Sequence, residues 1–170
     1  EEPANPSKSK ETPFNGYIIF DYESMIIDRK HHPAMVCILK VCALCLDHED
    51  ESCTVCEYRR FDSNDEFNSW LFKQKHFVCI AHNASSYDSV FISNYILKNT
   101  THQTKTPSYI MRGSKIMSIK WKGVKIIDSL LFFSMSLDNL TKALNIEAAK
   151  GFYPYSFYLP ENRNYLGPYP

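Results

Sequence analysis

Short apolar runs that alternate with helix-like segments most limit how this 170-residue chain can fold. Runs rich in Val, Ile and Phe predict buried strands, whereas apolar residues three or four positions apart predict helices. Strands with helices between them predict an α/β domain built on a mixed central sheet. We expect strands over residues 17–21, 35–42, 57–61, 77–81, 107–111, 115–121 and 124–127, and helices over about 64–73, 86–97 and 136–144.

Composition excludes some classes of protein. Hydrophobic residues make up 44% of the chain and charged residues 22%, as in ordinary globular domains. The net charge of zero argues against binding to nucleic acid or membrane through the charge of the whole chain. No apolar stretch is long enough for a transmembrane helix and no signal peptide is visible, so we expect an intracellular protein without a membrane partner.

Charge is unevenly distributed along the chain. Residues 89–127 contain no Asp or Glu but seven Lys or Arg residues. This asymmetry indicates a basic face beside an acidic site, which would suit a phosphate backbone. A solvated loop and strand surface explains the same run equally well.

Four of the six cysteines form two C-x-x-C pairs, Cys42 with Cys45 and Cys53 with Cys56, and seven residues separate the pairs. Each pair lets two thiolates reach one tetrahedral ion from a tight turn. The missing secretory signal favours a reducing compartment, so we predict one structural zinc ion with four cysteine ligands. Paired disulfides and free thiols are the alternatives, and the other two cysteines sit in apolar runs typical of a core.

The run Phe20-Asp21-Tyr22-Glu23-Ser24 places two acids at the end of a predicted buried strand. Because residues two apart in a strand point to the same face, Asp21 and Glu23 should project together. Carboxylates so placed repel one another unless a cation joins them, and hard divalent cations prefer oxygen ligands. A solvated strand end is the simpler explanation of the pair taken alone.

A second polar segment, A-H-N-A-S-S-Y-D over residues 81–88, follows another predicted strand and leads into a helix. Asp88 would sit near the first turn of that helix, close to the sheet edge, although the polar residues of the segment would also serve as helix caps. Together, F-D-x-E and N-x-x-x-Y-D resemble the first two motifs of the 3′–5′ proofreading exonuclease of family B DNA polymerases. The resemblance implies a ribonuclease H-like fold and assigns three metal-binding carboxylates to Asp21, Glu23 and Asp88.

Two later segments extend the resemblance to the protein-primed subgroup of this family. D-S-L-L-F-F, residues 128–133, resembles the S/T-L-x-x-hydrophobic motif, which contacts the primer strand and the terminal protein. K-G-F-Y, residues 150–153, resembles the K-x-x-hydrophobic motif, whose lysine assists the exonuclease. The cysteine pairs and the Tyr- and Pro-rich tail look most like polymerases of Polinton/Maverick transposons and related viruses. A nuclear location or a viral replication site would follow.

The resemblance implies an enzyme of DNA replication, a DNA-directed DNA polymerase, that also hydrolyses single-stranded DNA ends. Such a site uses two Mg²⁺ or Mn²⁺ ions about 4 Å apart to activate water and to stabilise the leaving 3′-oxygen. On this reading Asp21 bridges the ions, Glu23 holds the ion that orients the water, and Asp88 holds the other ion. Lys150 neutralises charge that develops near the scissile phosphate. The thiolate cluster is too soft to be this site.

Contacts with DNA are assigned in the same way. Unpaired bases stack on aromatic side chains, so the substrate should be a single-stranded 3′ end. Core packing is the alternative for the aromatic residues involved. Primer–template DNA and a terminal protein primer are the further partners. The expected contacts are Ser24 and Asn83 with sugar or phosphate, Tyr87 and Phe91 with bases, and Ser129 and Leu130 with the 3′ end.

The chain departs from the family pattern in one respect. No copy of the third exonuclease motif, Y-x-x-x-D, follows residue 150, and the polymerase palm motifs are absent. We therefore expect an N-terminal exonuclease-domain fragment that is inactive alone. Its parts would be a flexible leader over residues 1–15, the ribonuclease H-like domain over 16–150 with the zinc loop 42–56, and a linker over 151–170 toward the missing remainder.

Three alternatives to this assignment stay open. The first is a ribonuclease H-like nuclease unrelated to any polymerase. The second is a catalytically incomplete or domesticated transposon-derived module that binds nucleic acid. The third is a zinc-dependent interaction domain, although the seven-residue gap between the cysteine pairs fits poorly with fingers that read DNA.

Overall fold

The structure, a computed structural model, describes residues 13–48, 51–147, 153–154, 157, 159–162 and 164–168. Most of the predicted leader and Lys150 therefore lie outside the described residues. The strands are β1 (Gly16–Ile27), β2 (Lys30–Cys42), β3 (Glu57–Phe61), β4 (Phe77–Ala81), β5 (Ser108–Arg112), β6 (Lys115–Trp121) and β7 (Val124–Asp128). The α-helices are α1 (Asn64–Leu71), α2 (Asp88–Asn99) and α3 (Leu137–Ala143), and the 3₁₀ turns are η1 (Ala43–Cys45), η2 (Ala84–Ser86), η3 (Ser129–Leu131) and η4 (Pro160–Asn162).

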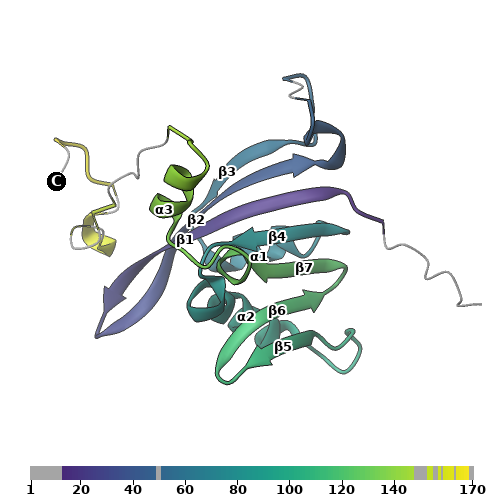
Figure 1. Ribbon diagram of the computed structural model, residues 1–170. Coiled ribbons are helices and arrows are strands. Elements are labelled where there is room, and N and C mark those ends of the chain that lie inside the picture. Colours follow the sequence, from purple (N-terminus) through teal and green to yellow (C-terminus); the bar gives the residue numbers. More distant parts are fainter. Residues whose placement is uncertain are drawn as a thin grey trace, which may run out of the picture.

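The seven strands form one sheet in the order β3-β2-β1-β4-β7-β6-β5 (Figure 1). β1 is parallel to β4 and β4 is parallel to β7, whereas the other neighbouring pairs are antiparallel. Parallel neighbours need crossover connections, and the crossovers here include α1 and α2. The predicted α/β fold with a mixed central sheet is confirmed. Within the described part of the chain, no helix combines the length and the apolar character that crossing a bilayer requires.

One face of the sheet carries the buried core. Ile18 and Ile38 of the first two strands pack in one cluster with Phe67 of α1 and Ile92 of α2. Ser63 caps α1, because its hydroxyl accepts a hydrogen bond from the backbone N–H of Glu66. On the opposite face of β1 and β2, the side chains of Ile19 and Leu39 are exposed.

The first strand extends beyond its predicted end. β1 stops pairing with β4 at Ile19 but continues against β2 as far as Ile27, so Asp21 lies within a strand rather than at its end. Asp28 and Arg29, with φ of 50° and 62°, close the hairpin between β1 and β2. Arginine is an unusual residue at positive φ, so this turn has no clear signal in the sequence. The extension matters because it places both acids of β1 where only β2 flanks them.

We expect the core side of β1 to depend on Phe67, which is 0% exposed. Its ring centroid lies 5.6 Å from that of Phe20 and 5.5 Å from that of Tyr22. Phe67→Ala should therefore lower the free energy of unfolding by about 3–5 kcal/mol. Phe132→Ala is the control, because that ring is 69% exposed, and it should cost less than about 0.5 kcal/mol. Urea denaturation measures both, and equal costs would contradict this core.

Candidate active site and cysteine cluster

The two acids of β1 lie on the face of the sheet that is opposite the core. Phe20 and Tyr22 are buried, whereas Asp21 and Glu23 alternate with them and keep contact with solvent. The pairing of β1 with β2 shifts immediately after Glu23, where Ala34 is an extra residue in β2. Bulges of this kind re-aim side chains and are frequent beside active sites. Both carboxylates therefore project from one face at an irregular point of the sheet.

Asp88 is the first residue of α2 and is only 3% exposed. Its carboxylate accepts a hydrogen bond from the backbone N–H of Tyr22 at 3.3 Å, which brings it beside the two acids of β1. Burial, and next the negative charge of Asp21, raise the pKa of Asp88 to about 7, although backbone hydrogen bonds oppose the shift. A buried carboxylate that faces another carboxylate is an arrangement that a divalent cation would relieve.

The three carboxylates are close but not gathered as tightly as ligands around one ion. Among the described residues, only the four cysteines bring three or more metal-binding atoms within 4.8 Å of one another. The carboxylates of Asp21, Glu23 and Asp88 nonetheless share one neighbourhood, because all three raise the pKa of Tyr87 in addition to its burial. Carboxylate oxygens are the kind of ligand that Mg²⁺ and Mn²⁺ prefer.

Asp128 is a fourth acid that the sequence analysis gave no role. It ends β7, is 1% exposed, and accepts hydrogen bonds from the backbone N–H groups of Asn83 (2.8 Å), Ser85 (2.9 Å) and Leu130 (2.9 Å). Burial acts to raise the pKa of Asp128, but a hydrogen bond with the side chain of Ser85, together with the three backbone hydrogen bonds, outweighs burial and holds the pKa below its usual value. The sequence signal for Asp128 is its position directly after an apolar run, and the same signal marks Asp21.

The segment between β4 and α2 is held in place by this acid. Asn83 adopts a positive φ of 66°, and its N–H group points to Asp128 rather than to solvent. The ring of His82 lies 3.0 Å from the hydroxyl of Ser129 and 3.0 Å from the carbonyl of Met135. Ser129 and Leu130, two of the expected DNA contacts, are therefore fixed to the same segment as Asn83. His82 was not singled out from the sequence.

Tyr87 and Ser24 meet directly on the other side of Asp88. The hydroxyl of Tyr87 donates a hydrogen bond to that of Ser24, and His31 Nδ1 lies 3.1 Å from both hydroxyls. A cavity of about 220 Å³ opens here and is lined by Glu23, Ser24, His31 and Tyr87 among others. The contact of His31 forms across the β1–β2 hairpin, so nothing local in the sequence indicates it.

Phe91 and Tyr87 are both half-buried and pack against the core. The ring of Phe91 lies 5.3 Å from that of Tyr22 and 5.1 Å from that of Tyr87, measured between centroids. Core packing, the alternative expected for both aromatic residues, therefore describes part of each ring's environment.

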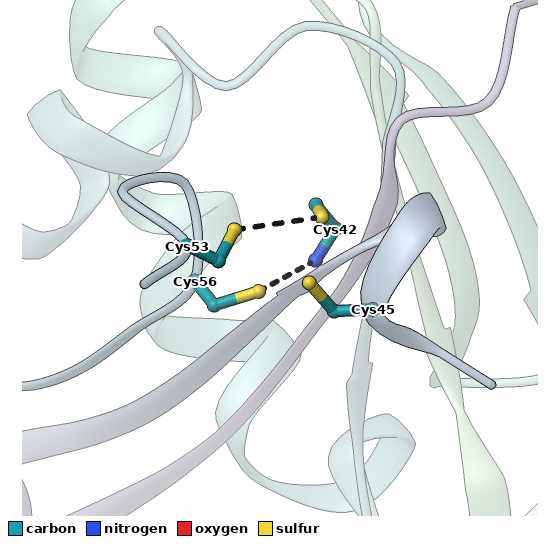
Figure 2. A group of neighbouring side chains, drawn as sticks. All are labelled: Cys42, Cys45, Cys53 and Cys56. Atoms are coloured by element: carbon teal, nitrogen blue, oxygen red, sulfur yellow. Dashed lines mark hydrogen bonds between the residues drawn. The ribbon is translucent and has the colours of Figure 1, made fainter. Parts of the chain in front are cut away.

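The four paired cysteines converge as the sequence predicts (Figure 2). Their sulfur atoms come from the end of β2, from η1 and from the segment before β3, and lie within 4.8 Å of one another. All six cysteines are free. The sulfur atoms of Cys42 and Cys53 lie 3.9 Å apart, well beyond the length of a disulfide bond. The disulfide alternative is therefore not what the structure holds.

The ionisation of these sulfurs is uneven. The N–H of Cys42 donates to the sulfur of Cys56 at 3.3 Å. Hydrogen bonds from the backbone of Cys56 and then of Val55 lower the pKa of Cys53 to about 7, whereas hydrogen bonds with Cys42 and then Cys53 raise the pKa of Cys45 to about 12. Zinc binds thiolates, so a bound ion would favour the charged form of all four sulfurs, and their convergence fits a structural zinc ion.

Asp128 allows a direct test of how the site is held. Asp128→Ala would leave three backbone N–H groups without this acceptor, one of them buried and two partly buried, so it should lower the free energy of unfolding by about 3 kcal/mol. Asp128→Asn keeps one acceptor oxygen and should cost clearly less. Asp138→Ala removes an exposed acid of α3 and should cost less than about 1 kcal/mol. Urea denaturation of the three variants would contradict the assignment if Asp128→Ala and Asp138→Ala matched.

Solved structures with a similar fold are DNA polymerases. Phi29 DNA polymerase with primer-template DNA and incoming nucleotides matches 91% of this chain and 27% of its own, with a TM-score of 0.67 and 20% identity. The same enzyme with single-stranded DNA matches 83% of this chain and 25% of its own, at 0.64 and 19%. The family B DNA polymerase of Pyrobaculum calidifontis matches 89% and 22%, at 0.56 and 12%. These likenesses confirm the ribonuclease H-like fold expected from the resemblance to protein-primed family B polymerases.

Sequence comparisons agree with the fold. A probable DNA polymerase of Ascobolus immersus is 37% identical over 86 residues, which cover 45% of this chain and 7% of that protein. This chain thus spans a small part of the relative that it matches, and about a quarter of phi29 DNA polymerase. Residues 69–167 match the family described as DNA polymerase type B, organellar and viral. More than half of the chain lies in that match, and the chain belongs to this family of type B DNA polymerases.

Proposed function

We propose that this chain is a fragment of the exonuclease domain of a protein-primed, DNA-directed DNA polymerase. The fragment is inactive alone, and the longer polymerase removes nucleotides from single-stranded 3′ ends. One observation carries the proposal: Asp21, on the open face of β1, faces the buried Asp88 across the start of α2. These two acids are more than 60 residues apart in the chain. The hydrogen bond from the backbone of β1 to Asp88 brings them together, so only the folded chain forms this site. Family membership and fold support the same reading.

The residues suit a two-metal site, and each has a distinct task. Two Mg²⁺ or Mn²⁺ ions would supply a metal-activated water and stabilisation of the leaving oxygen. Asp21 would bridge the two ions, since it shares a face of β1 with Glu23 and its charge raises the pKa of Asp88. Glu23, which lines the 220 Å³ cavity, would hold the ion that orients the water, and the buried Asp88 would hold the other ion. The hydrogen bond from Tyr22 fixes where Asp88 points.

The substrate strand approaches this edge from two sides. Tyr87 offers an aromatic face to an unpaired base, and Ser24 is held beside it for a contact to sugar or phosphate. Asn83, Ser129 and Leu130 lie on the β7 side and receive the 3′ end there. Phe91 supports the ring of Tyr87 from below. Lys150, outside the described residues, is assigned to the charge on the scissile phosphate.

The partners follow from the same assignment. Phi29 DNA polymerase has been solved with primer-template DNA and with single-stranded DNA, and we assign the same classes of DNA to the polymerase that contains this chain. A terminal protein primer is the third proposed partner. DNA synthesis by this polymerase would take place in the nucleus or at a viral replication site. The cysteine cluster takes a structural Zn²⁺ ion and has no part in hydrolysis.

Loss of Asp21 should remove the exonuclease activity without unfolding the protein. In the longer polymerase that contains this chain, we expect Mg²⁺-dependent 3′–5′ degradation of a labelled single-stranded oligonucleotide, abolished by EDTA. Asp21→Ala should lower its rate by several orders of magnitude, because losing a metal ligand removes several kcal/mol of charge stabilisation. Asp62→Ala changes an exposed acid away from the site and should leave the rate unchanged.

Thermal denaturation in EDTA provides the structural control for Asp21→Ala. The side chain is exposed, so the melting temperature should stay within a few degrees of that of the wild type. Equal degradation by wild type and Asp21→Ala would refute the carboxylate assignment. A polymerase that binds the oligonucleotide but never degrades it would favour a catalytically incomplete binding module.

The cysteine cluster should contain about one zinc ion per chain in protein purified without added metal. Cys53→Ser should lose the ion and lower the melting temperature, because metal binding contributes folding free energy. Cys37→Ser is the matched control, since that cysteine lies on β2 outside the cluster and the variant should keep its zinc. Elemental analysis together with thermal denaturation measures both. Four readily alkylated thiols and no metal in the wild type would overturn the zinc assignment.

A further inference from the structure

A second hollow opens at the β5–β6 hairpin, beside the segment that joins β4 to α2. It measures about 730 Å³ and runs between the hairpin turn and η3. Arg112 and Lys115 line it from the hairpin, Leu130 and Leu131 line it from η3, and Ser85 forms part of its wall. We call this hollow the hairpin groove. None of its lining residues is an acid.

The two cations of the hairpin groove are placed against each other by the strand pairing. Arg112 and Lys115 are direct cross-strand partners at the end of the hairpin, and Gly113, with φ of 60°, makes the turn between them. Like charges directly opposite one another destabilise a hairpin. Within the described part of the chain neither cation forms an ion pair, and both side chains are exposed. Two adjacent unpaired cations without a structural role indicate an anionic ligand.

The floor of the hairpin groove is apolar and irregular. The pairing of β5 with β6 shifts between Ile110 and Met111, which leaves Met117 as an extra residue of β6. This bulge turns Met117 toward the groove, where it lies with Leu130 and Leu131. Apolar side chains beneath a pair of cations match a ligand that has both flat apolar groups and phosphates. Single-stranded nucleic acid is such a ligand.

The hairpin groove joins the candidate active site through Ser85. This residue lies in the wall of the groove, and its N–H group donates to Asp128 at the end of β7. β6 runs antiparallel to β7, with Ser118 opposite Ile127, so the start of β6 lies beside the end of β7. The hairpin turn therefore lies at the same end of the strands as the 82–86 segment and Asp88.

We propose that the hairpin groove binds the sugar–phosphate backbone of single-stranded DNA behind its 3′ end. Arg112 and Lys115 each contact one phosphate, and Met117 and Leu130 contact the bases between them. The groove acts without regard to sequence, because phosphates and base faces are common to all nucleotides. The proposal rests on the proposed function, since it extends the path of the same strand. It also gives the acid-free stretch over residues 89–127 a specific task.

The test measures binding apart from hydrolysis. Fluorescence anisotropy of a labelled single-stranded oligonucleotide with the longer polymerase, in EDTA, reports affinity at a series of salt concentrations. The double variant Arg112→Ala/Lys115→Ala should bind roughly tenfold or more weakly. Its plot of log affinity against log salt should be shallower by about 1.4, since each lost phosphate contact on a single strand contributes about 0.7. Lys98→Ala/Lys105→Ala is the control, with the same change of charge in the same acid-free stretch and no place in the groove.

A second measurement locates the contacts on the DNA. Oligonucleotides that carry one neutral methylphosphonate at successive positions should bind the wild type less well at two positions behind the 3′ end. The double variant should be insensitive at those positions, because the cations that met the phosphates are gone. If it behaves as the control does in both assays, the groove proposal is overturned. A polymerase that shows the expected binding loss but no Mg²⁺-dependent degradation would overturn the proposed exonuclease function and leave the groove standing.

Discussion

The candidate active site depends on the register of a single strand, β1. Side chains alternate along a strand, so Phe20 and Tyr22 enter the core only when Asp21 and Glu23 stand on the opposite face. A slip of one residue would bury two carboxylates and expose two aromatic rings. Burying unpaired carboxylates costs far more than the pairing of the strand returns. The aromatic core under β1 therefore decides where the carboxylates lie.

Asp128 and Asp88 are both buried beside this site, but their surroundings differ, and so do the structural and chemical roles that they suit. Asp128 accepts hydrogen bonds from three backbone N–H groups, and these together with the side chain of Ser85 hold its pKa below the usual value in spite of burial. Asp88 is buried to a similar degree but faces Asp21, and its pKa is raised to about 7. The first acid is satisfied by the fold and fixes the segment that follows β4. Asp88 keeps the electrostatic repulsion from Asp21, and such a perturbed carboxylate is expected of a ligand-binding group.

Local pattern predicts much of the fold and part of the site. Strands β3 and β6 agree with their predicted ranges because each is bounded by clear turns, and the acids of the two exonuclease-like motifs are recognisable from their spacing. The contacts that complete the site join residues far apart in the chain. Tyr87 reaches His31 over 56 positions, and Asp128 reaches Asn83 over 45. No window of sequence contains both partners, so only the assembled sheet reveals them.

The pair of strands β1 and β2 also connects the two candidate metal centres. Cys42 ends β2 opposite Gly16, and a side chain at Gly16 would collide with the carbonyl of Val41, so the strands approach closely at this end. The pairing then continues without a shift as far as Glu23, opposite Met35. An ion held by the cysteines would fix the first pairs of the ladder, and the register from there to the carboxylates follows. Soft thiolates and hard carboxylates stay at separate places along one ladder, so each set would select its own ion, and an ion at the cysteines would act on the carboxylates through strand register.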